Sequence, residues 1–226
     1  MRFSISSLGA MLLVGNLSYG VVINTPDDSN RTRTIAASTL SRADYDTWFQ
    51  AAEAGDIGQM QSLIDRGINV NYQNWIGYTA LMCAAGEENI PAMKFLLDNN
   101  AILDGALAFA TRKGREESAK FLLANGSRAT EKWAISAAVV SGNINVVRLL
   151  LENGANPNGD GYWNAPLIIA AEGHDWDIFR LLLKYNADPQ VRNRRGYTVF
   201  DFARATQCYG IVGGIIQDMQ HRQENN

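Results

Sequence analysis

Residues 77–101 read GYTALMCAAGEENIPAMKFLLDNNA, and this stretch decides the fold. A pair of alanines at 84–85 opens a short helix whose small side chains let neighbouring helices approach closely. A pair of leucines at 96–97 follows at a spacing that predicts a buried stripe on a second helix. Asn100 stands where that helix should end, and asparagine readily adopts the left-handed conformation that ends helices. The stretch therefore predicts a helix, a turn and a second helix.

The same arrangement occurs five times along the chain. Small pairs that open the first helix occur at Ala51-Ala52, Ala84-Ala85, Ala110-Thr111, Ala138-Val139 and Ala170-Ala171. Apolar pairs on the second helix occur at Leu63-Ile64, Leu96-Leu97, Leu122-Leu123, Leu150-Leu151 and Leu182-Leu183. The residue that ends each second helix is glycine or asparagine, at Gly67, Asn100, Gly126, Gly154 and Asn186. Five independent occurrences indicate an internal repeat.

A unit of helix, turn, helix and loop with a period of about 33 residues resembles the ankyrin repeat and its T-P-L-H-x-A signature. The stretches GYTALMCAA at 77–85 and NAPLIIAA at 164–171 carry the resemblance, which covers residues 45–220. A sixth unit opens with GYTVFDFA at 196–203. The resemblance implies an all-α repeat solenoid, an ankyrin-type helix-turn-helix stack with short β-hairpin loops.

Two of the repeats are shortened. Steps between the equivalent alanines at 51, 84, 110, 138, 170 and 203 are 33, 26, 28, 32 and 33 residues. The short steps lose residues from the loops at 102–105 and 128–132, while both helix patterns persist. We therefore expect two truncated hairpins and a gap in the row of projecting loops. Glu88 and His174 occupy positions between paired helices where glycine is expected, and we expect them to adopt positive φ.

The chain divides into four predicted segments. They are a secretory signal at 1–20, a flexible linker at 21–42, the ankyrin repeat domain at 43–220 and a polar tail at 221–226. The repeats are assigned to 43–70, 71–103, 104–128, 129–157, 158–190 and 191–220. The terminal repeats should each present one water-compatible face.

The predicted signal combines one early charge, Arg2, with an apolar run at 11–14 and small residues at Ser18 and Gly20. An uncleaved membrane anchor is the alternative, but several serines make the segment too polar for a good spanning helix. We expect an exported protein, periplasmic in a Gram-negative bacterium and otherwise secreted, with no stable membrane insertion after signal removal.

Composition limits the chemistry of this chain of 226 residues. A net charge of -3 argues against nucleic-acid binding, which needs a basic surface to neutralise phosphates. The two cysteines, Cys83 and Cys208, fall in the second and sixth repeats, too far apart for a disulfide, so both should be free and buried. The histidines are His174, expected in an inter-helix turn, and His221, and neither forms a catalytic triad by sequence. We therefore expect no enzymatic activity, no metal and no cofactor.

Binding residues in the ankyrin resemblance lie at the loop tips and along the concave edge of the first helices. Carried onto this chain, the predicted partner-binding residues are Trp75, Ile76, Tyr78, Arg112, Lys113, Tyr162, Trp163, Arg192, Arg194, Arg195 and Tyr197. Val140 and Ser141 lie on the same edge. Trp, Tyr and Arg dominate binding hot spots, which favours a protein partner.

Packing between adjacent loops is the alternative for the aromatic tips, and for Tyr78 and Tyr197 the two interpretations stay open. Trp75 favours binding, because the truncated hairpin of the third repeat leaves it without a full neighbour. Trp48, Trp133 and Trp176 fall on predicted helices and are assigned to packing.

Three functions are compatible with this reading. The leading hypothesis is an exported, monomeric, non-enzymatic protein–protein interaction module that uses its hairpin tips and concave face. The alternative is a periplasmic inhibitor or immunity protein that occludes a specific enzyme or toxin. A small-molecule or metal-handling protein is a third class, and it would need a pocket that the pattern does not indicate.

Overall fold

The computed structural model of the chain describes residues 40–160 and 165–224. The predicted signal and nearly all of the predicted linker lie outside the described residues. Twelve helices occupy the described part, and no strand occurs there. The short hairpin loops expected from the sequence are therefore turns without strand pairing.

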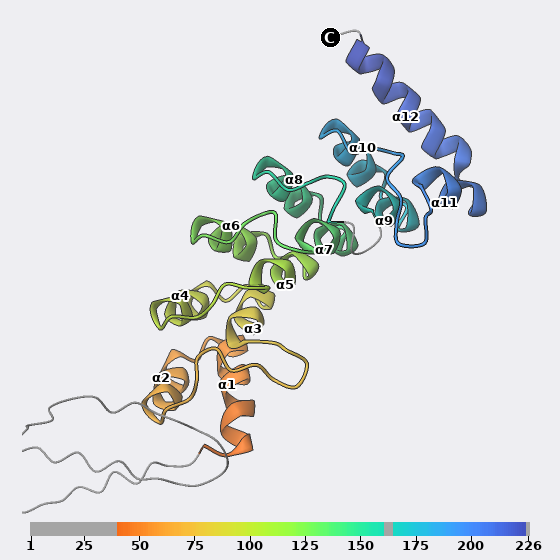
Figure 1. Cartoon of the computed structure of the whole chain (residues 1–226). Helices are drawn as coiled ribbons and strands as arrows, with labels where there is room; N and C mark the ends of the chain where they lie inside the picture. Colours follow the sequence, from red (N-terminus) through yellow and green to blue (C-terminus); the bar gives the residue numbers. More distant parts are fainter. Residues whose placement is uncertain (1–39, 161–164, 225–226) are drawn as a thin grey trace, which may run out of the picture.

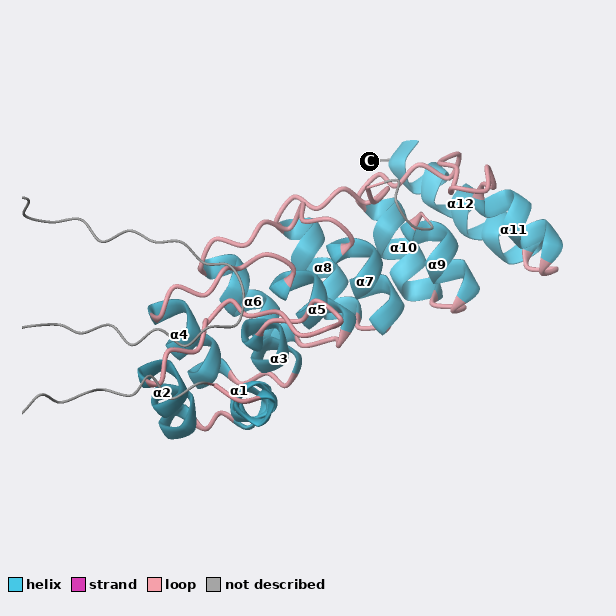
Figure 2. Ribbon diagram, turned by 60° about the horizontal axis from the view of Figure 1, so that its bottom comes forward, coloured by secondary structure: helices cyan, strands magenta, loops and turns pink. Residues whose placement is uncertain are grey.

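The helices form six consecutive pairs. They are α1 (Arg42–Ala54) with α2 (Ile57–Asp65), α3 (Ala80–Gly86) with α4 (Ile90–Asp98), α5 (Ala106–Arg112) with α6 (Glu116–Ala124), α7 (Ala134–Ser141) with α8 (Ile144–Glu152), α9 (Pro166–Glu172) with α10 (Trp176–Lys184), and α11 (Val199–Ala205) with α12 (Tyr209–Glu224). First helices form one row and second helices a parallel row, so the molecule is an elongated stack (Figures 1 and 2). The all-α repeat solenoid is confirmed.

Helix ends follow the local signals in the sequence. Ser41 begins α1 with a capping box, because its hydroxyl accepts from the Asp44 amide while the Asp44 carboxylate accepts from the Ser41 amide. The predicted left-handed residues after the second helices all have positive φ: Gly67, Asn100, Gly126, Gly154 and Asn186. Glu88 and His174 also have positive φ, at 60° and 58°, as expected for turn residues.

The core lies between the two rows of helices. The first leucine of each apolar pair is at most 2% exposed, at Leu63, Leu96, Leu122, Leu150 and Leu182. The residue one turn earlier is fully buried in every repeat, at Met60, Met93, Ala119, Val147 and Phe179. Since each repeat covers the apolar face of the next, burial is continuous along the stack, as in other repeat proteins.

The third and fourth repeats keep their helices and lose only loop residues. Helices α5 and α6 have 7 and 9 residues, the same lengths as α3 and α4. Thr111 stands where the first, second and fifth repeats have a second alanine, and its buried hydroxyl donates to the Ala134 carbonyl of α7 at 3.2 Å. Helices α5 and α7 therefore pack directly together. Figure 1 shows the loop before α3 projecting from the stack, whereas the loops before α5 and α7 do not project.

The sixth repeat contains the longest helix of the described residues. Helix α12 has 16 residues and continues through Glu224, into the segment assigned to the polar tail. Cys83 and Cys208 are both free and buried, as predicted. Among the described residues, no helix combines the length and apolar character needed to cross a membrane.

Candidate functional site: a groove at the two truncated hairpins

Two full-length loops are built on the same turn, which we call a finger. In the second repeat, the Asn74 side-chain oxygen accepts from the amides of Ile76 and Tyr78 at 3.1 and 2.9 Å. In the sixth repeat, the Asn193 oxygen accepts from the amides of Arg195 and Tyr197 at 2.9 and 3.0 Å. Asparagine thus fixes the turn through its own side chain, and the intervening positions are free to vary.

The third and fourth repeats replace the finger with a single left-handed residue directly before the first helix. Gly105 has φ 75° and ψ −10° before α5, and Trp133 has φ 68° and ψ −8° before α7. The two positions are equivalent, 28 residues apart. Glycine adopts this conformation without a steric penalty, whereas a bulky residue there is an outlier. Trp133 therefore sits where the backbone favours glycine.

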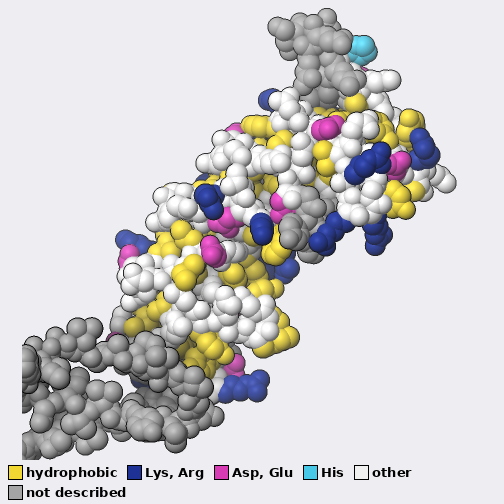
Figure 3. Space-filling view, viewed as in Figure 1, with side chains coloured by type: hydrophobic (Ala, Val, Ile, Leu, Met, Phe, Trp, Pro, Cys, Tyr) yellow, Lys and Arg dark blue, Asp and Glu magenta, His cyan; other side chains and the backbone are white. Residues whose placement is uncertain are grey.

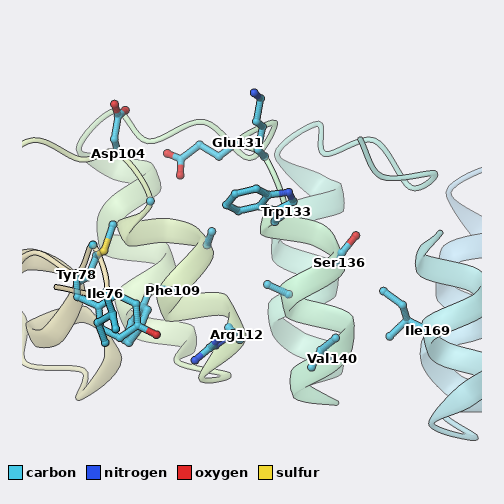
Figure 4. Close-up of a pocket in the computed structure, with 16 residues that line it drawn as sticks. Ile76, Tyr78, Asp104, Phe109, Arg112, Glu131, Trp133, Ser136, Val140 and Ile169 are labelled. Atoms are coloured by element: carbon cyan, nitrogen blue, oxygen red, sulfur yellow. The ribbon is translucent and has the colours of Figure 1, made fainter. Parts of the chain in front are cut away.

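An open groove of about 700 Å³ occupies the space that the missing fingers leave. One side is the finger of the second repeat, the floor is formed by α5 and α7, and Ile169 of α9 closes the far side (Figure 4). The side chains that line it are mostly apolar: Ile76, Tyr78, Met82, Ala108, Phe109, Trp133, Ala137, Val140 and Ile169. This volume is in the range typical of ligand sites.

Aromatic side chains from different repeats form one wall of the groove. The Tyr78 ring packs edge-on against Phe109 of α5, with ring centroids 4.7 Å apart. The Arg112 guanidinium lies 5.7 Å from the centre of the Phe109 ring. Tyr78 therefore packs between repeats, and it also lines the groove, so its part in binding stays a prediction.

Trp133 faces this wall across the groove. Its side chain is 46% exposed, and its backbone amide donates to the Asp160 carboxylate at 3.0 Å. The assignment of Trp133 to helix packing is wrong, because the residue precedes α7 and projects into the groove (Figure 4). The assignment is confirmed for Trp48, which is fully buried. Trp176 is half-buried and packs against Phe179.

Charged groups flank the apolar floor at both ends. Asp104 and Glu131 lie at the end nearest the loops, and Arg112 lies toward the other end (Figure 4). The Oε2 atom of Glu131 is buried. Burial raises the pKa of Glu131 and the nearby Asp104 carboxylate adds to this increase, while the Arg128 backbone and the Ser127 side chain oppose it. Lys132 also lines the loop end.

The groove contains three of the predicted partner-binding residues, Ile76, Tyr78 and Arg112, together with Val140 of the predicted concave edge. Trp75, at the tip of the same finger, is 91% exposed and lies outside the groove lining, and Lys113 is also exposed outside it. Tyr162 and Trp163 lie outside the described residues. Their roles, and that of Trp75, stay predictions.

The basic finger of the sixth repeat lies toward the C-terminal end, away from the groove. Arg192 donates to the Gly196 carbonyl of its own turn at 2.6 Å and lies 4.0 Å from the Asp201 carboxylate. Arg194, Arg195 and Tyr197 are exposed. On the face shown in Figure 3, Lys and Arg side chains occur along the whole stack, including this half. These four residues stay predicted contacts.

Sequence reasoning missed Trp133, Glu131, Asp104, Phe109 and Ile169 as groove residues. The signal for Trp133 was present, because aligning the third and fourth repeats on Ala110 and Ala138 places Trp133 on Gly105. The other residues depend on how neighbouring repeats meet.

The described residues offer little for catalysis. His174 Nε2 lies 3.8 Å from Cys208 Sγ, a contact that the sequence did not reveal, but Cys208 is buried and its thiol also donates to the Thr206 carbonyl. No group of three or more potential metal ligands occurs in residues 40–160 and 165–224.

An elongated stack of paired helices defines the class of repeat-scaffold proteins. Family models extend this result to the sequence: a model of ankyrin repeats in three copies matches residues 48–132, a single ankyrin repeat matches 133–160, and ankyrin repeats in many copies match 150–203. The chain belongs to the ankyrin repeat proteins. Ankyrin repeats generally mediate protein–protein interaction, and domains of this kind are typically non-enzymatic.

Curated relatives include an ankyrin repeat-containing protein of Treponema pallidum (strain Nichols), 29% identical over 157 residues, 63% of this chain and 51% of the relative. An ankyrin repeat protein of Acanthamoeba polyphaga mimivirus is 35% identical over 74 residues, 32% of this chain and 17% of the relative. The chain thus spans at most about half the length of these two relatives.

Solved structures agree in fold. An ankyrin repeat domain from Acinetobacter baumannii AYE has a TM-score of 0.61 at 23% identity, covering 77% of this chain and 97% of that one. The ankyrin repeat domain of Bcl-3, a member of the IkappaB protein family, has a TM-score of 0.60 at 21% identity, covering 73% and 80%. At these identities, the likeness concerns the fold alone.

Proposed function

We propose that this chain is a monomeric, non-enzymatic interaction module whose protein partner is held in the groove and against the finger of the second repeat. The observation that carries the proposal is the exposed Trp133, which the chain keeps at a position where φ is 68° and glycine would fit without strain. Strained residues that persist at a concave surface are candidates for function. Trp and Tyr also provide large contact area at a low cost in side-chain entropy.

The test is capture of a partner on the immobilised chain, followed by affinity measurement with single variants. Trp133→Ala should weaken binding at least tenfold, as expected for a buried aromatic contact. Ile211→Ala is the matched control, because Ile211 is 49% exposed on α12, far from the groove. A partner that binds Trp133→Ala and the control equally well would show that the groove is not its site.

The variant Trp75→Ala separates the fingertip from the groove. Among the large apolar side chains of the described residues Trp75 is the most exposed, at 91%, and we propose that it contacts the partner from the finger's outer side. Loss of binding in both tryptophan variants supports a contact that spans finger and groove. Loss in Trp75→Ala alone would move the site to the fingertip.

We also propose that the protein is exported. This part of the proposal rests on the predicted secretory signal at residues 1–20 of the sequence. The protein is then periplasmic or secreted, according to the type of cell. N-terminal sequencing of the protein purified from its source is the test. Finding the Met1 end on the native protein would refute cleavage of the predicted signal.

A further inference from the structure

Building on the proposed function of the groove, we propose that it recognises an extended segment of a protein partner in which a large apolar residue lies beside a lysine or arginine. The apolar side chain enters between the Tyr78–Phe109 wall and Trp133. The basic side chain ends at the carboxylates of Asp104 and Glu131.

The apolar half of this specificity follows from the shape and lining of the groove. Its volume of about 700 Å³ exceeds that of one side chain, so a stretch of several residues is required to fill it. Phe109 and Val140 belong to different helices, and Val140 is 62% exposed at the groove. Covering these side chains removes apolar surface from water, which favours an apolar occupant over a polar one.

The basic half follows from the carboxylates at the loop end. Asp104 and Glu131 both line the groove there, and carboxylate oxygens accept hydrogen bonds, so a group that binds them must be a donor. A basic side chain supplies both donors and a complementary charge. An acidic partner residue would instead add another negative charge beside Asp104 and Glu131.

The distribution of charge also determines which end of the groove the basic side chain occupies. Asp104 and Glu131 lie at the loop end, whereas Arg112 lies toward the other end, over the Phe109 ring (Figure 4). The loop end also holds two basic groups, Lys132 in the groove lining and Arg128 beside Glu131, and a third carboxylate, Asp160, which accepts from the Trp133 amide. Three carboxylates and two basic groups leave one negative charge there. A basic side chain is attracted to the loop end and repelled by Arg112, which places its apolar neighbour over α5 and α7.

The experiment selects peptides from a random twelve-residue library displayed on phage, using the full chain as bait. Enriched peptides should share a large apolar residue next to lysine or arginine. The strongest peptide is then measured by calorimetry on Glu131→Gln, which removes the charge and keeps the shape. Binding should weaken about tenfold, the effect of losing one charge-assisted hydrogen bond. A peptide whose basic residue is replaced by methionine should bind wild type and Glu131→Gln equally.

The outcomes separate this inference from the proposed function. Peptides that need Trp133 but lack a basic residue, or that bind Glu131→Gln at full strength, would refute the basic specificity and leave the groove as the site. Peptides that bind Trp133→Ala at full strength would refute the groove itself.

Other occupants of the groove give different results. A dimer in light scattering that Trp133→Ala converts to a monomer would show that a second copy fills the groove. Peptide binding that requires deletion of residues 21–39 would show that the chain's own N-terminal segment fills it. Either result would overturn the inference.

Discussion

Replacing Trp133 by glycine and, separately, by alanine tests whether its left-handed backbone is imposed by the fold. Both variants lose the same indole contacts. The side chain is 46% exposed, so roughly 100 Å² of a large aromatic surface is buried, worth about 2.5 kcal/mol at most. Alanine keeps the steric cost of the left-handed conformation, about 1–2 kcal/mol, which glycine removes. Glycine in turn loses about 0.5–1 kcal/mol more conformational entropy on folding.

Trp133→Gly should therefore be more stable than Trp133→Ala by about 0.5–1 kcal/mol. This order is diagnostic, since glycine is less stable than alanine by about 1 kcal/mol inside a helix. Ala137→Gly, on α7, is the matched control and should show that ordinary loss. Urea unfolding followed by far-ultraviolet circular dichroism measures the difference, which corresponds to a midpoint shift of about 0.3 M for a slope of ~2 kcal/mol per molar.

If Trp133→Ala is as stable as Trp133→Gly, then residue 133 is not held at positive φ. A strained tryptophan would then no longer support a binding role for the groove. The result is independent of any partner, so it tests the structural basis of the proposed site before a partner is known.

Three further predictions concern the groove, a finger and a thiol. Because burial raises the pKa of Glu131, the native state holds its proton more tightly than the unfolded chain, and stability falls as pH rises through that native pKa. The Glu131→Gln variant should therefore have a higher thermal unfolding midpoint than the wild-type protein at pH 7, and the difference should vanish below about pH 4. Equal thermal midpoints at pH 7 would contradict this. Asn74→Ala removes the acceptor of two finger amides, so it should cost about 0.5–1.5 kcal/mol in thermal unfolding and speed hydrogen exchange at Ile76 and Tyr78; unchanged exchange would refute the turn. Burial, with the Glu53 charge second, raises the pKa of the Cys83 thiol to about 12, so maleimide at pH 8 should leave Cys83 unlabelled until urea is added, as mass spectrometry would show.

The repeat architecture was predictable because its signals are local. A glycine or asparagine at the end of a second helix predicts a positive φ at its own position. The structure has positive φ at Asn100 and Asn186 as well as at the glycines. The apolar pair reports on one face of one helix. The truncation of two loops was also predictable, because equal helix patterns at shorter spacing leave only the loop to lose residues.

The groove was only partly predictable because it is formed between repeats. Tyr78 and Phe109 are 31 residues apart, and their ring contact depends on how α3 and α5 stack. The direction of a side chain at a turn is also set by its surroundings, so Ile76 lines the groove while the adjacent Trp75 does not. Trp133 was missed for a different reason. The helix pattern does not show whether residue 133 is the first residue of α7 or the cap before it, and only alignment with Gly105 identifies it as the cap.

The groove exists because two loops are short, whereas the stability of the fold comes from the packed helices. The shape of the binding surface can therefore change without a change in the helices. Ile102 and Thr130, one in each shortened loop, are exposed and lie outside the helices, whereas the neighbouring Ala129 is buried. Insertions beside these two exposed residues leave the helices themselves intact, and doubling a flexible loop costs only about 0.6 kcal/mol of closure entropy. A homologue could close the groove by insertion alone, or a designer could reshape it by grafting new loops at these two points. Loop length can therefore vary during evolution and change which partner the protein binds, while the helices stay the same.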